Sequence, residues 1–371
     1  MELQEVTTRR QLRHFVRFPD SLYRGCPQYV PALHFDQMRT LTRDAALEYC
    51  THKMWLVTEG NKVLGRICAM INPHYNERYS KKCVRFGWFD CVNDARVANM
   101  LFAAAEAWGK EQGMEKIHGP LFFNTLGKQG MLVDGYENVP PFNCIYNYPY
   151  YNGFVESYGF EKECDWVQYR IHSQLGVPDK TKRVAKLVME RYNLHFGSLD
   201  KLTKDKALVR KFFEIYSDSF KDKVYNFIPF TPAEMEQEAR TVLPFVNDRD
   251  SVVVLDENEE IVAFGICTPS ISKALQKARG RLFPFGWIHL LRARSDFSMM
   301  DLMINGAVPE WQNRGVSSIY YEKMAEKALQ YNYGDSISNP QIESNSAANI
   351  WNAYPGHTLY MRRRCYIKDI R

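Results

Sequence analysis

The feature that most constrains the fold is one order of predicted elements that occurs twice along the chain. In the first half, apolar periodicity predicts a hairpin, a strand, a long helix and a further strand, at residues 54–58 with 62–71, 84–92, 95–112 and 116–118. The second half predicts the same series at 252–255 with 261–267, 299–307, 316–331 and 336–338. A nearly constant spacing relates Gly65 to Ala263 and Gly159 to Gly356. We therefore expect an α/β protein (α+β, with mixed sheets) built from two tandem copies of one unit.

Chain length supports the same division, because 371 residues at about 150 per domain predict two domains. We expect a first domain at residues 1–177 and a second at 184–371, joined by a linker at 178–183. Each half also carries an insertion between the matching elements, at 121–148 in the first half and at 269–294 in the second.

Composition excludes several classes of protein. The chain is 45% hydrophobic and 25% charged, which is typical of a globular protein. Its net charge of +5 is too small for the strongly basic face of a nucleic-acid binder. Nine dispersed cysteines without a C-x-x-C pair indicate reduced thiols, and no apolar stretch approaches the roughly 18 residues of a membrane span. With a polar segment at residues 1–13, these features predict a cytoplasmic protein.

The segment with the clearest chemistry is residues 308–317, between the strand predicted at 299–307 and the long helix after it. The first N–H groups of a helix lack internal partners and lie at its positive end, so they bind anions. Gly315 would let the backbone approach a bulky ligand, and Arg314 would add charge-assisted hydrogen bonds. The alternative interpretation is an ordinary loop that contains a glycine.

This segment resembles the signature of the GNAT acyltransferase superfamily, Q/R-x-x-G-x-G/A after a V-P turn. Gln312-x-x-Gly315-x-Ser317 fits that signature, except that serine replaces the final glycine or alanine. Because the element order matches in both halves, the chain resembles tandem-GNAT bacterial proteins, with two GNAT-like domains. The resemblance implies acetyl-CoA or another acyl-CoA as co-substrate. Because no cysteine has a companion histidine at a telling spacing and the histidines are scattered, we expect no metal. The residues that the resemblance assigns to the acyl-CoA site are Ala307, Val308, Gln312, Asn313, Arg314, Gly315, Val316, Ser317 and Asn345.

The matching segment of the first half, residues 89–96, lacks the glycine. Two carboxylates, Asp90 and Asp94, stand where a pyrophosphate would bind and should repel it. We expect the first domain to be a degenerate GNAT-like domain that no longer binds CoA.

The resemblance also implies a mechanism in which an amine attacks the acyl thioester directly, with a tyrosine as general acid. Asn352 occupies the position of that tyrosine, on a helix predicted at 347–353. Tyr354 is the substitute candidate for the acid, against the alternative of a packed aromatic. Glu343 and Asp301 are candidates for the base, although exposed or paired carboxylates are commoner than catalytic ones.

The two insertions each allow two interpretations. Residues 269–294 combine six basic residues, no acidic residue and several aromatics, typical of a lid over an acyl chain or of contact with anionic lipid. The favoured alternative is a segment packed against the other half with its charges in solvent. Residues 121–148, with Asn124, Lys128 and Asn147, have the composition of a binding loop or of a hydrogen-bonded interface.

Three functions follow as hypotheses. The first is an acyl-CoA-dependent N-acyltransferase that transfers acetyl to a primary amine, on a small molecule or peptide, as a monomer or homodimer and without nucleic acid. The second is a catalytically silent double domain that binds acyl-CoA or a peptide. The third is a transferase that acts at a lipid surface with a longer acyl chain; a membrane surface is the less favoured partner.

Overall fold

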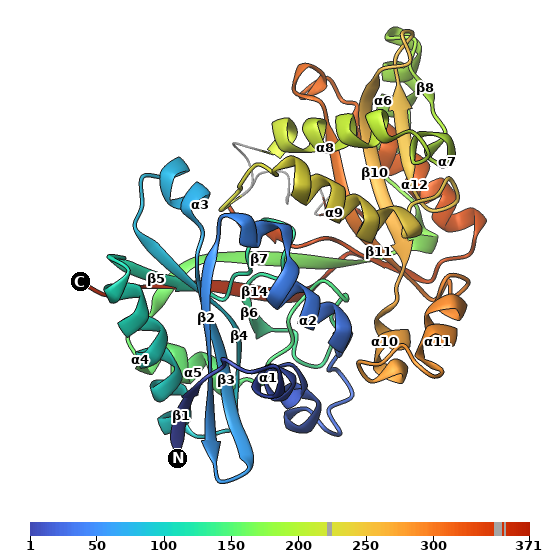
Figure 1. The fold of residues 1–371 in the computed structure, drawn as a ribbon. Coiled ribbons are helices and arrows are strands. Elements are labelled where there is room, and N and C mark those ends of the chain that lie inside the picture. The colour runs from blue at the N-terminus through green and yellow to red at the C-terminus, as the bar shows by residue number, and fades with distance from the viewer. Residues whose placement is uncertain (221–224, 345–350, 352–353) are drawn as a thin grey trace. The chain divides into compact units, whose positions relative to one another are not determined.

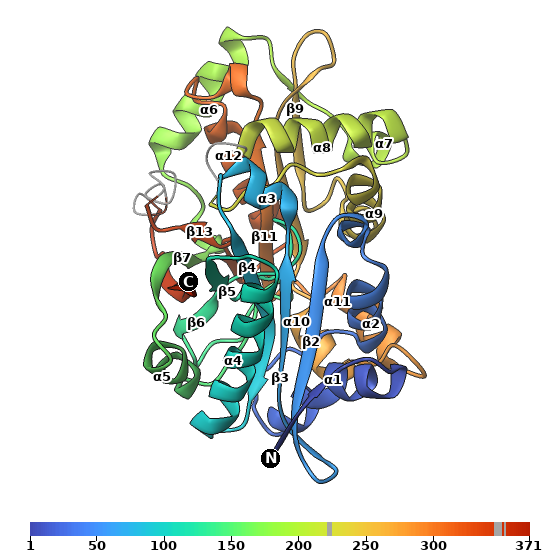
Figure 2. The same ribbon diagram turned by 60° about the vertical axis from the view of Figure 1, so that its left-hand side comes forward.

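The computed structural model describes residues 1–220, 225–344, 351 and 354–371. The chain forms two compact units, and each of them is discontinuous in sequence. Unit 1 contains Met1–Trp166, Ile271–Leu291 and Met361–Arg371, whereas unit 2 contains Val167–Ser270 and Arg292–Tyr360. Figures 1 and 2 show the chain from two directions.

Unit 1 is built on a mixed sheet in the order β1-β2-β3-β4-β5-β14, in which β4 and β5 are the parallel pair and β6 pairs with β14. Its strands are β1 (Glu2–Glu5), β2 (Thr51–Glu59), β3 (Lys62–Ile71), β4 (Cys83–Cys91), β5 (Lys116–Gly119), β6 (Met131–Asp134) and the part of β14 (Thr358–Asp369) from Met361 on. The last strand of the chain therefore completes the first sheet.

Helices cover both faces of this sheet, as the alternation of side chains along β2 requires. Trp55 and Val57 pack in one core with α4 (Ala95–Glu111) and α5 (Tyr150–Ser157). Met54 and Leu56 point the other way, into a second core with α1 (Arg9–Leu22). Unit 1 also contains α2 (His34–Arg43), η1 (Ala45–Glu48), α3 (Pro73–Arg78), α10 (Ser272–Ala278) and, up to Leu291, α11 (Gly286–Ala293).

Unit 2 repeats the architecture with the order β7-β12-β11-β10-β9-β8, in which β11 and β12 are parallel. Its strands are β7 (Glu161–His172) from Val167 on, β8 (His195–Phe196), β9 (Val252–Leu255), β10 (Ile261–Pro269), β11 (Met299–Ala307), β12 (Asp335–Ile337) and β13 (Gln341–Ile342). Its helices are α6 (Asp179–Arg191), α7 (Leu199–Leu202), α8 (Lys206–Phe220), α9 (Pro232–Val242) and α12 (Ser317–Gln330), with short turns η2 (Ser173–Leu175), η3 (Leu243–Phe245) and η4 (Pro309–Trp311). Strand β7 comes from the first half of the sequence.

The expected α/β class with mixed sheets is confirmed, and β3, β9 and β11 have the predicted bounds. The prediction of a linker at residues 178–183 is wrong, because α6 begins at Asp179, directly after Pro178, which occupies the N-cap position of that helix. The division into domains at 1–177 and 184–371 stays a prediction about the duplicated sequence. The compact units themselves are discontinuous. The helix predicted at 347–353 lies almost wholly outside the described residues.

Most of the second insertion packs within unit 1. The Ser272 hydroxyl donates to the Pro140 carbonyl, and the Gln276 amide donates to the carbonyls of Pro27 and Tyr29. This agrees with the interpretation of residues 269–294 as a segment packed against the other half of the sequence. Within the described part of the chain, no helix is long and apolar enough to cross a bilayer.

Candidate active site

In both units the two parallel strands at the centre of the sheet pair over a short length and then separate. In unit 2, β11 and β12 pair only at Met299–Asp301, and β11 continues alone on that side to Ala307. In unit 1, β4 pairs with β5 only at Cys83–Arg85 and continues to Cys91. Each sheet therefore opens at one defined point, with Asp301 at the last pair in unit 2 and Arg85 at the last pair in unit 1.

Asp301 is a buried carboxylate without the hydrogen bonds that such a group normally has. Only 2% of it is exposed, and neither of its oxygens accepts a hydrogen bond of normal geometry from the described residues. Burial raises its pKa to about 7, and the nearby Ser270 hydroxyl opposes this shift only in part. Since a carboxylic acid with a pKa near neutrality can accept a proton at physiological pH, Asp301 has the properties of a general base.

A second buried carboxylate in unit 2 shows how unusual this arrangement is. Asp250 is also fully buried, but it accepts hydrogen bonds from the Tyr333 hydroxyl at 2.7 Å and from the Arg249 guanidinium at 2.8 and 2.6 Å. Buried carboxylates with such partners are stabilising parts of a fold. Asp301 has no comparable partner among the described residues, so its burial has no structural explanation of this kind.

Tyr354 lies on the other face of the same opening. It lines a pocket of about 400 Å³, partly open to solvent, together with Met300 and Leu302 of β11 and Tyr321 of α12. Because successive side chains of a strand alternate, Asp301 faces away from this pocket. The Tyr354 hydroxyl is buried without a hydrogen-bond partner among the described residues, and burial raises its pKa well above the usual range. It therefore keeps its proton at neutral pH, as a general acid must.

Strand β11 contains a β-bulge two residues after Asp301. Ile304 is paired with Ile266 and Leu302 with Cys267, so Met303 is the extra residue. The same irregularity occurs in β4 of unit 1, where Asp90 pairs with Arg66 but Gly87 pairs with Cys68. Bulges are common next to active sites because they redirect side chains and interrupt pairing. Sequence periodicity did not reveal either bulge, since one extra residue hardly alters an apolar strand pattern.

The 312–317 segment has the backbone geometry of an anion site. Gly315 (φ +83°) and Asn313 (φ +63°) are left-handed, and α12 starts at Ser317. Among the described residues, no acceptor pairs with the backbone N–H groups of 313–317. The Gln312 amide donates to the Ala307 carbonyl at 3.0 Å, so this side chain fastens the segment to the end of β11.

The structure gives a further reason for glycine at position 315. A Cβ atom there would lie 3.2 Å from the Val184 side chain and 3.3 Å from that of Val188, both on α6. The close approach of α6 and the left-handed backbone therefore both favour glycine. Arg314 is exposed, and its guanidinium carbon lies 5.2 Å from the centroid of the Trp311 ring, which leaves its N–H groups available to a ligand.

The remaining predicted residues of unit 2 contribute less. Val308 and Val316 are buried packing residues, and Ala307 ends β11. Glu343 is exposed just after β13, whereas Asp301 is buried, so the two predicted bases have different environments. Asn345 lies outside the described residues.

Unit 1 differs from unit 2 near the start of its long helix, where the sequence predicts two carboxylates, Asp90 and Asp94. The Asp94 carboxylate caps α4 by accepting from the Arg96 backbone N–H at 2.9 Å, and it is paired with the Arg96 guanidinium at 2.7 Å. The neighbouring cation lowers the pKa of Asp94. The second expected carboxylate, Asp90, is not at the helix start, because it lies inside β4. The helix N-terminus of unit 1 thus already has its own anion.

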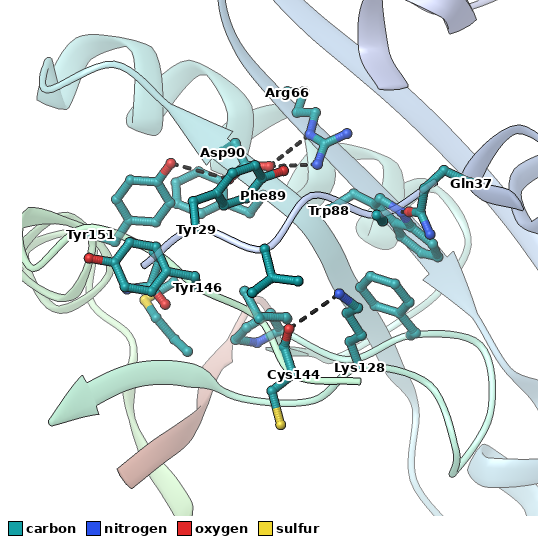
Figure 3. A pocket seen from close by; sticks show the side chains of 17 residues that line it. Tyr29, Gln37, Arg66, Trp88, Phe89, Asp90, Lys128, Cys144, Tyr146 and Tyr151 are labelled. Carbon is teal, nitrogen blue, oxygen red and sulfur yellow. Dashed lines mark hydrogen bonds and ion pairs between the residues drawn. The ribbon is translucent and has the colours of Figure 1, made fainter. Parts of the chain in front are cut away.

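Unit 1 contains a separate pocket at its bulged strand (Figure 3). It encloses about 620 Å³, part of it open to solvent, and its lining includes six aromatic residues, Tyr29, Trp88, Phe89, Phe122, Tyr146 and Tyr151. In its wall, Asp90 is paired with Arg66 at 2.7 Å and accepts from the Tyr23 hydroxyl at 2.8 Å. Lys128 of the first insertion donates to the Cys144 carbonyl, and burial lowers its pKa to about 8. The first insertion therefore does line a cavity.

One cluster in unit 1 has the residue types of a metal site. Donor atoms of His118, Glu163 and Cys365 lie within 4.8 Å of one another. However, His118 and Glu163 are already in contact at 3.3 Å, and the Lys81 ammonium lies 3.6 Å from Glu163. Burial lowers the pKa of His118, and the positive charge of the Arg85 guanidinium acts in the same direction. Cations at this distance disfavour a bound divalent ion.

Comparisons with known proteins place this geometry in context. No family model matches the chain. The chain is 28% identical over 288 residues to Protein YghO of Escherichia coli (strain K12), a match that covers 76% of this chain and 72% of that protein. It is 27% identical over 292 residues to the bacterial ceramide synthase of Caulobacter vibrioides, covering 77% of this chain and 74% of that protein.

Solved structures match over the full length. A tandem GNAT protein from the clavulanic acid biosynthesis pathway superposes with a TM-score of 0.57 at 11% identity, covering 100% of this chain and 99% of that one. At such low identity this similarity concerns the fold alone. It agrees with the duplicated sheet order, the separating parallel strands and the helix that follows each of them. The chain has the fold of the tandem GNAT proteins.

Proposed function

We propose that unit 2 catalyses acyl-CoA-dependent N-acyl transfer, in which an amine attacks the acyl thioester directly. The observation that carries this proposal is Asp301, a buried carboxylate with a pKa of about 7 at the point where β11 and β12 separate. A fold gains nothing from burying such a group without hydrogen bonds, whereas an acyltransferase requires a base that removes a proton from an ammonium.

In this mechanism the two faces of the opening have different tasks. Asp301 accepts a proton from the ammonium group of the acceptor, and the resulting amine nitrogen forms a bond to the thioester carbonyl carbon. The carbon–sulfur bond breaks, and the thiolate takes a proton from Tyr354 or from water. The nitrogen loses its second proton to that same donor, directly or through solvent, which restores the donor and leaves a neutral amide. The products are an amide and the free thiol of CoA, with one proton left on Asp301 to be released to solvent.

The donor would be held at the start of α12. Five consecutive backbone N–H groups, at residues 313–317, have no protein acceptor among the described residues, and the helix dipole adds positive potential there. A pyrophosphate has enough oxygens to accept several of these bonds, and Arg314 would add a charged donor. Acetyl-CoA is the simplest donor of this class.

Unit 1 would not bind CoA in the same way. A carboxylate caps its helix, and a buried guanidinium, Arg85, occupies the position of Asp301 and donates to the carbonyls of Phe122 and Phe123. Neither the anion site nor the base is therefore present in unit 1.

The test is the release of CoA thiol, followed by mass spectrometry, with acetyl-CoA and a panel of primary amines. We expect turnover with at least one amine, and we expect Asp301→Asn to lower kcat by about 10²- to 10⁴-fold while CoA still binds. Arg314→Glu should instead weaken CoA binding in isothermal titration. Arg210→Glu, also exposed on unit 2 but on α8, is the control for charge reversal. Binding of CoA without turnover for any amine would favour the silent binding module, and absence of CoA binding would refute both.

A second candidate concerns the acceptor. The Caulobacter relative is named for the synthesis of ceramide, an amide of a fatty acid with a long-chain amine. We propose, as the alternative to a small polar amine, that the acceptor is a long-chain amine and the acyl group longer than acetyl. Including sphinganine-type amines and palmitoyl-CoA in the same panel distinguishes the two candidates.

A further inference from the structure

The second insertion, which contains α10 and α11 (Figure 2), exposes an unusual amount of apolar side chain on the turn before α11 and on α11 itself. Phe283 is 79% exposed, Phe285 68%, Leu291 53% and Trp287 43%. Single exposed apolar residues are common, but four within nine residues of sequence are an unusual concentration. We call Phe283, Phe285, Trp287 and Leu291 the apolar patch.

The insertion that carries this patch also carries exposed cations without carboxylate partners among the described residues. Lys273, Lys277, Arg279, Arg281 and Arg292 are exposed, and none of them forms an ion pair with a carboxylate among the described residues. Residues 269–294 contain no acidic residue. Elsewhere on the surface many lysines and arginines are paired, as Lys82 is with Glu115 and Arg240 with Glu236. The positive charge of this segment is therefore available to a partner.

The segment is held in place rather than free to collapse onto its own apolar residues. Ser272 and Gln276 of α10 donate to carbonyls of residues 140, 27 and 29, and the His34 backbone N–H donates to the Gly280 carbonyl. The Trp287 indole N–H donates to the Pro284 carbonyl at 2.9 Å, which keeps the ring beside the turn. Ordered neighbours on one side and exposed aromatics on the other are the arrangement of a docking surface.

We propose that residues 279–292 form a membrane-docking surface that binds the anionic headgroup region of a lipid bilayer. Phenylalanine, tryptophan and leucine partition into the interface between headgroups and acyl chains, and lysine and arginine beside them attract anionic lipid. Because residues 269–294 contain six basic and no acidic residues, the complementary partner is an anionic surface. The proposal does not depend on the acyltransferase activity.

Vesicle sedimentation tests the proposal without any turnover. Full-length protein is mixed with phosphatidylcholine vesicles that do or do not contain phosphatidylglycerol. We expect binding to the anionic vesicles, weaker binding to the neutral ones, and a decrease as salt rises, because the charges are exposed. Absence of binding to anionic vesicles at low salt would overturn the proposal and leave a protein as the partner.

Two sets of variants separate this surface from the rest of the molecule. Phe283→Ser with Phe285→Ser should lower partitioning by about tenfold or more, since two aromatic rings are withdrawn from the interface. Leu187→Ser is the matched control, because Leu187 is 63% exposed but lies on α6. Equal binding of the double variant and the wild type would refute the assignment. If the double variant has a lower Tm, Phe283→Ser alone serves, because that side chain is the most exposed.

A spectroscopic experiment gives the position of the segment directly. Lipids that carry a quencher in the upper acyl chain should quench part of the tryptophan fluorescence of the wild type. The Trp287→Phe variant should bind equally well but lose this quenching. Unchanged quenching in that variant would show that another part of the protein meets the bilayer.

Discussion

Replacement of Asp301 by asparagine should stabilise the protein and abolish its activity. In the folded state the pKa of this carboxyl is about 7, against a usual value of 3.8. Because the pKa of Asp301 is higher in the folded than in the unfolded state, ionisation of this carboxyl destabilises the folded state. Stability is therefore lost as pH rises from about 4 to about 7 and stays low above that. Each pKa unit corresponds to about 1.4 kcal/mol, so ionised Asp301 costs at most about 4 kcal/mol.

Asparagine has nearly the same shape and no charge to desolvate. Since its amide still lacks partners, part of the gain is lost, and about 2 to 4 kcal/mol of the unfolding free energy should be recovered at pH 8. Near pH 4 the two proteins should differ little, because the wild-type carboxyl is then protonated in the fold. The measurement is urea denaturation of both proteins at several pH values, with thermal melting as a second readout.

The matched control is Asp250→Asn. Asp250 is equally buried in the same unit but is bonded to Tyr333 and Arg249, so its replacement should destabilise the protein by about 1 to 3 kcal/mol. If the unfolding free energies of wild type and Asp301→Asn depend on pH in the same way, the Asp301 carboxylate is not desolvated and the reasoning is wrong. If Asp301→Asn is more stable than the wild type but has the same kcat, the Asp301 carboxylate is desolvated as described but does not act as the base.

Three further predictions concern single positions. Ser317→Glu places a negative charge at the start of α12, as Asp94 does at the start of α4. Isothermal titration should show that CoA affinity falls by about tenfold or more, while the charge stabilises the helix by about 0.3 to 1 kcal/mol. Weaker CoA binding together with a lower Tm would instead mean that the variant is misfolded. Tyr354→Phe removes a hydroxyl without a described partner, so the Tm should hardly change while kcat falls by about tenfold or more, and unchanged kcat would mean that water is the acid. Asp90→Asn breaks the buried pair with Arg66 and should cost about 3 to 5 kcal/mol in urea denaturation, with CoA binding by the folded protein unaffected; a smaller loss would mean that the pair is solvated.

Much of the fold could be predicted from the sequence because apolar periodicity is strong in buried elements. The hairpins and the long helices α4 and α12 followed from it directly. Residues 178–183 were harder, since a charged stretch after proline is typical both of a linker and of the first turn of an exposed helix. The packing of α6 against α12 near Gly315 distinguishes the two, and this packing is a property of the folded chain.

The site was predicted in part. The helix-start segment at 312–317 was found because its residues are contiguous and its glycine is informative. Asp301 was only one of two base candidates, since burial and missing partners are properties of the folded chain and not of a local pattern. The bulges in β4 and β11 and the pocket of unit 1 combine residues that are far apart in sequence, so no local signal could have found them.

Each unit contains a strand from the other half of the sequence: unit 1 contains β14 from Met361 on, and unit 2 contains β7 from Val167 on. This arrangement has a consequence for any attempt to study the two units separately. Tyr366 and Ile370 lie in the core of unit 1 although they belong to the last few residues of the chain. A truncation at residue 177 would remove β14, so β5 would keep only β4 as a partner and the backbone groups along its other side would be exposed to water. Cutting the chain between its two halves would therefore remove a strand from the sheet of unit 1. A substitution in β14 from Met361 on would affect the packing of unit 1, although the other strands of that unit lie in the first half of the sequence.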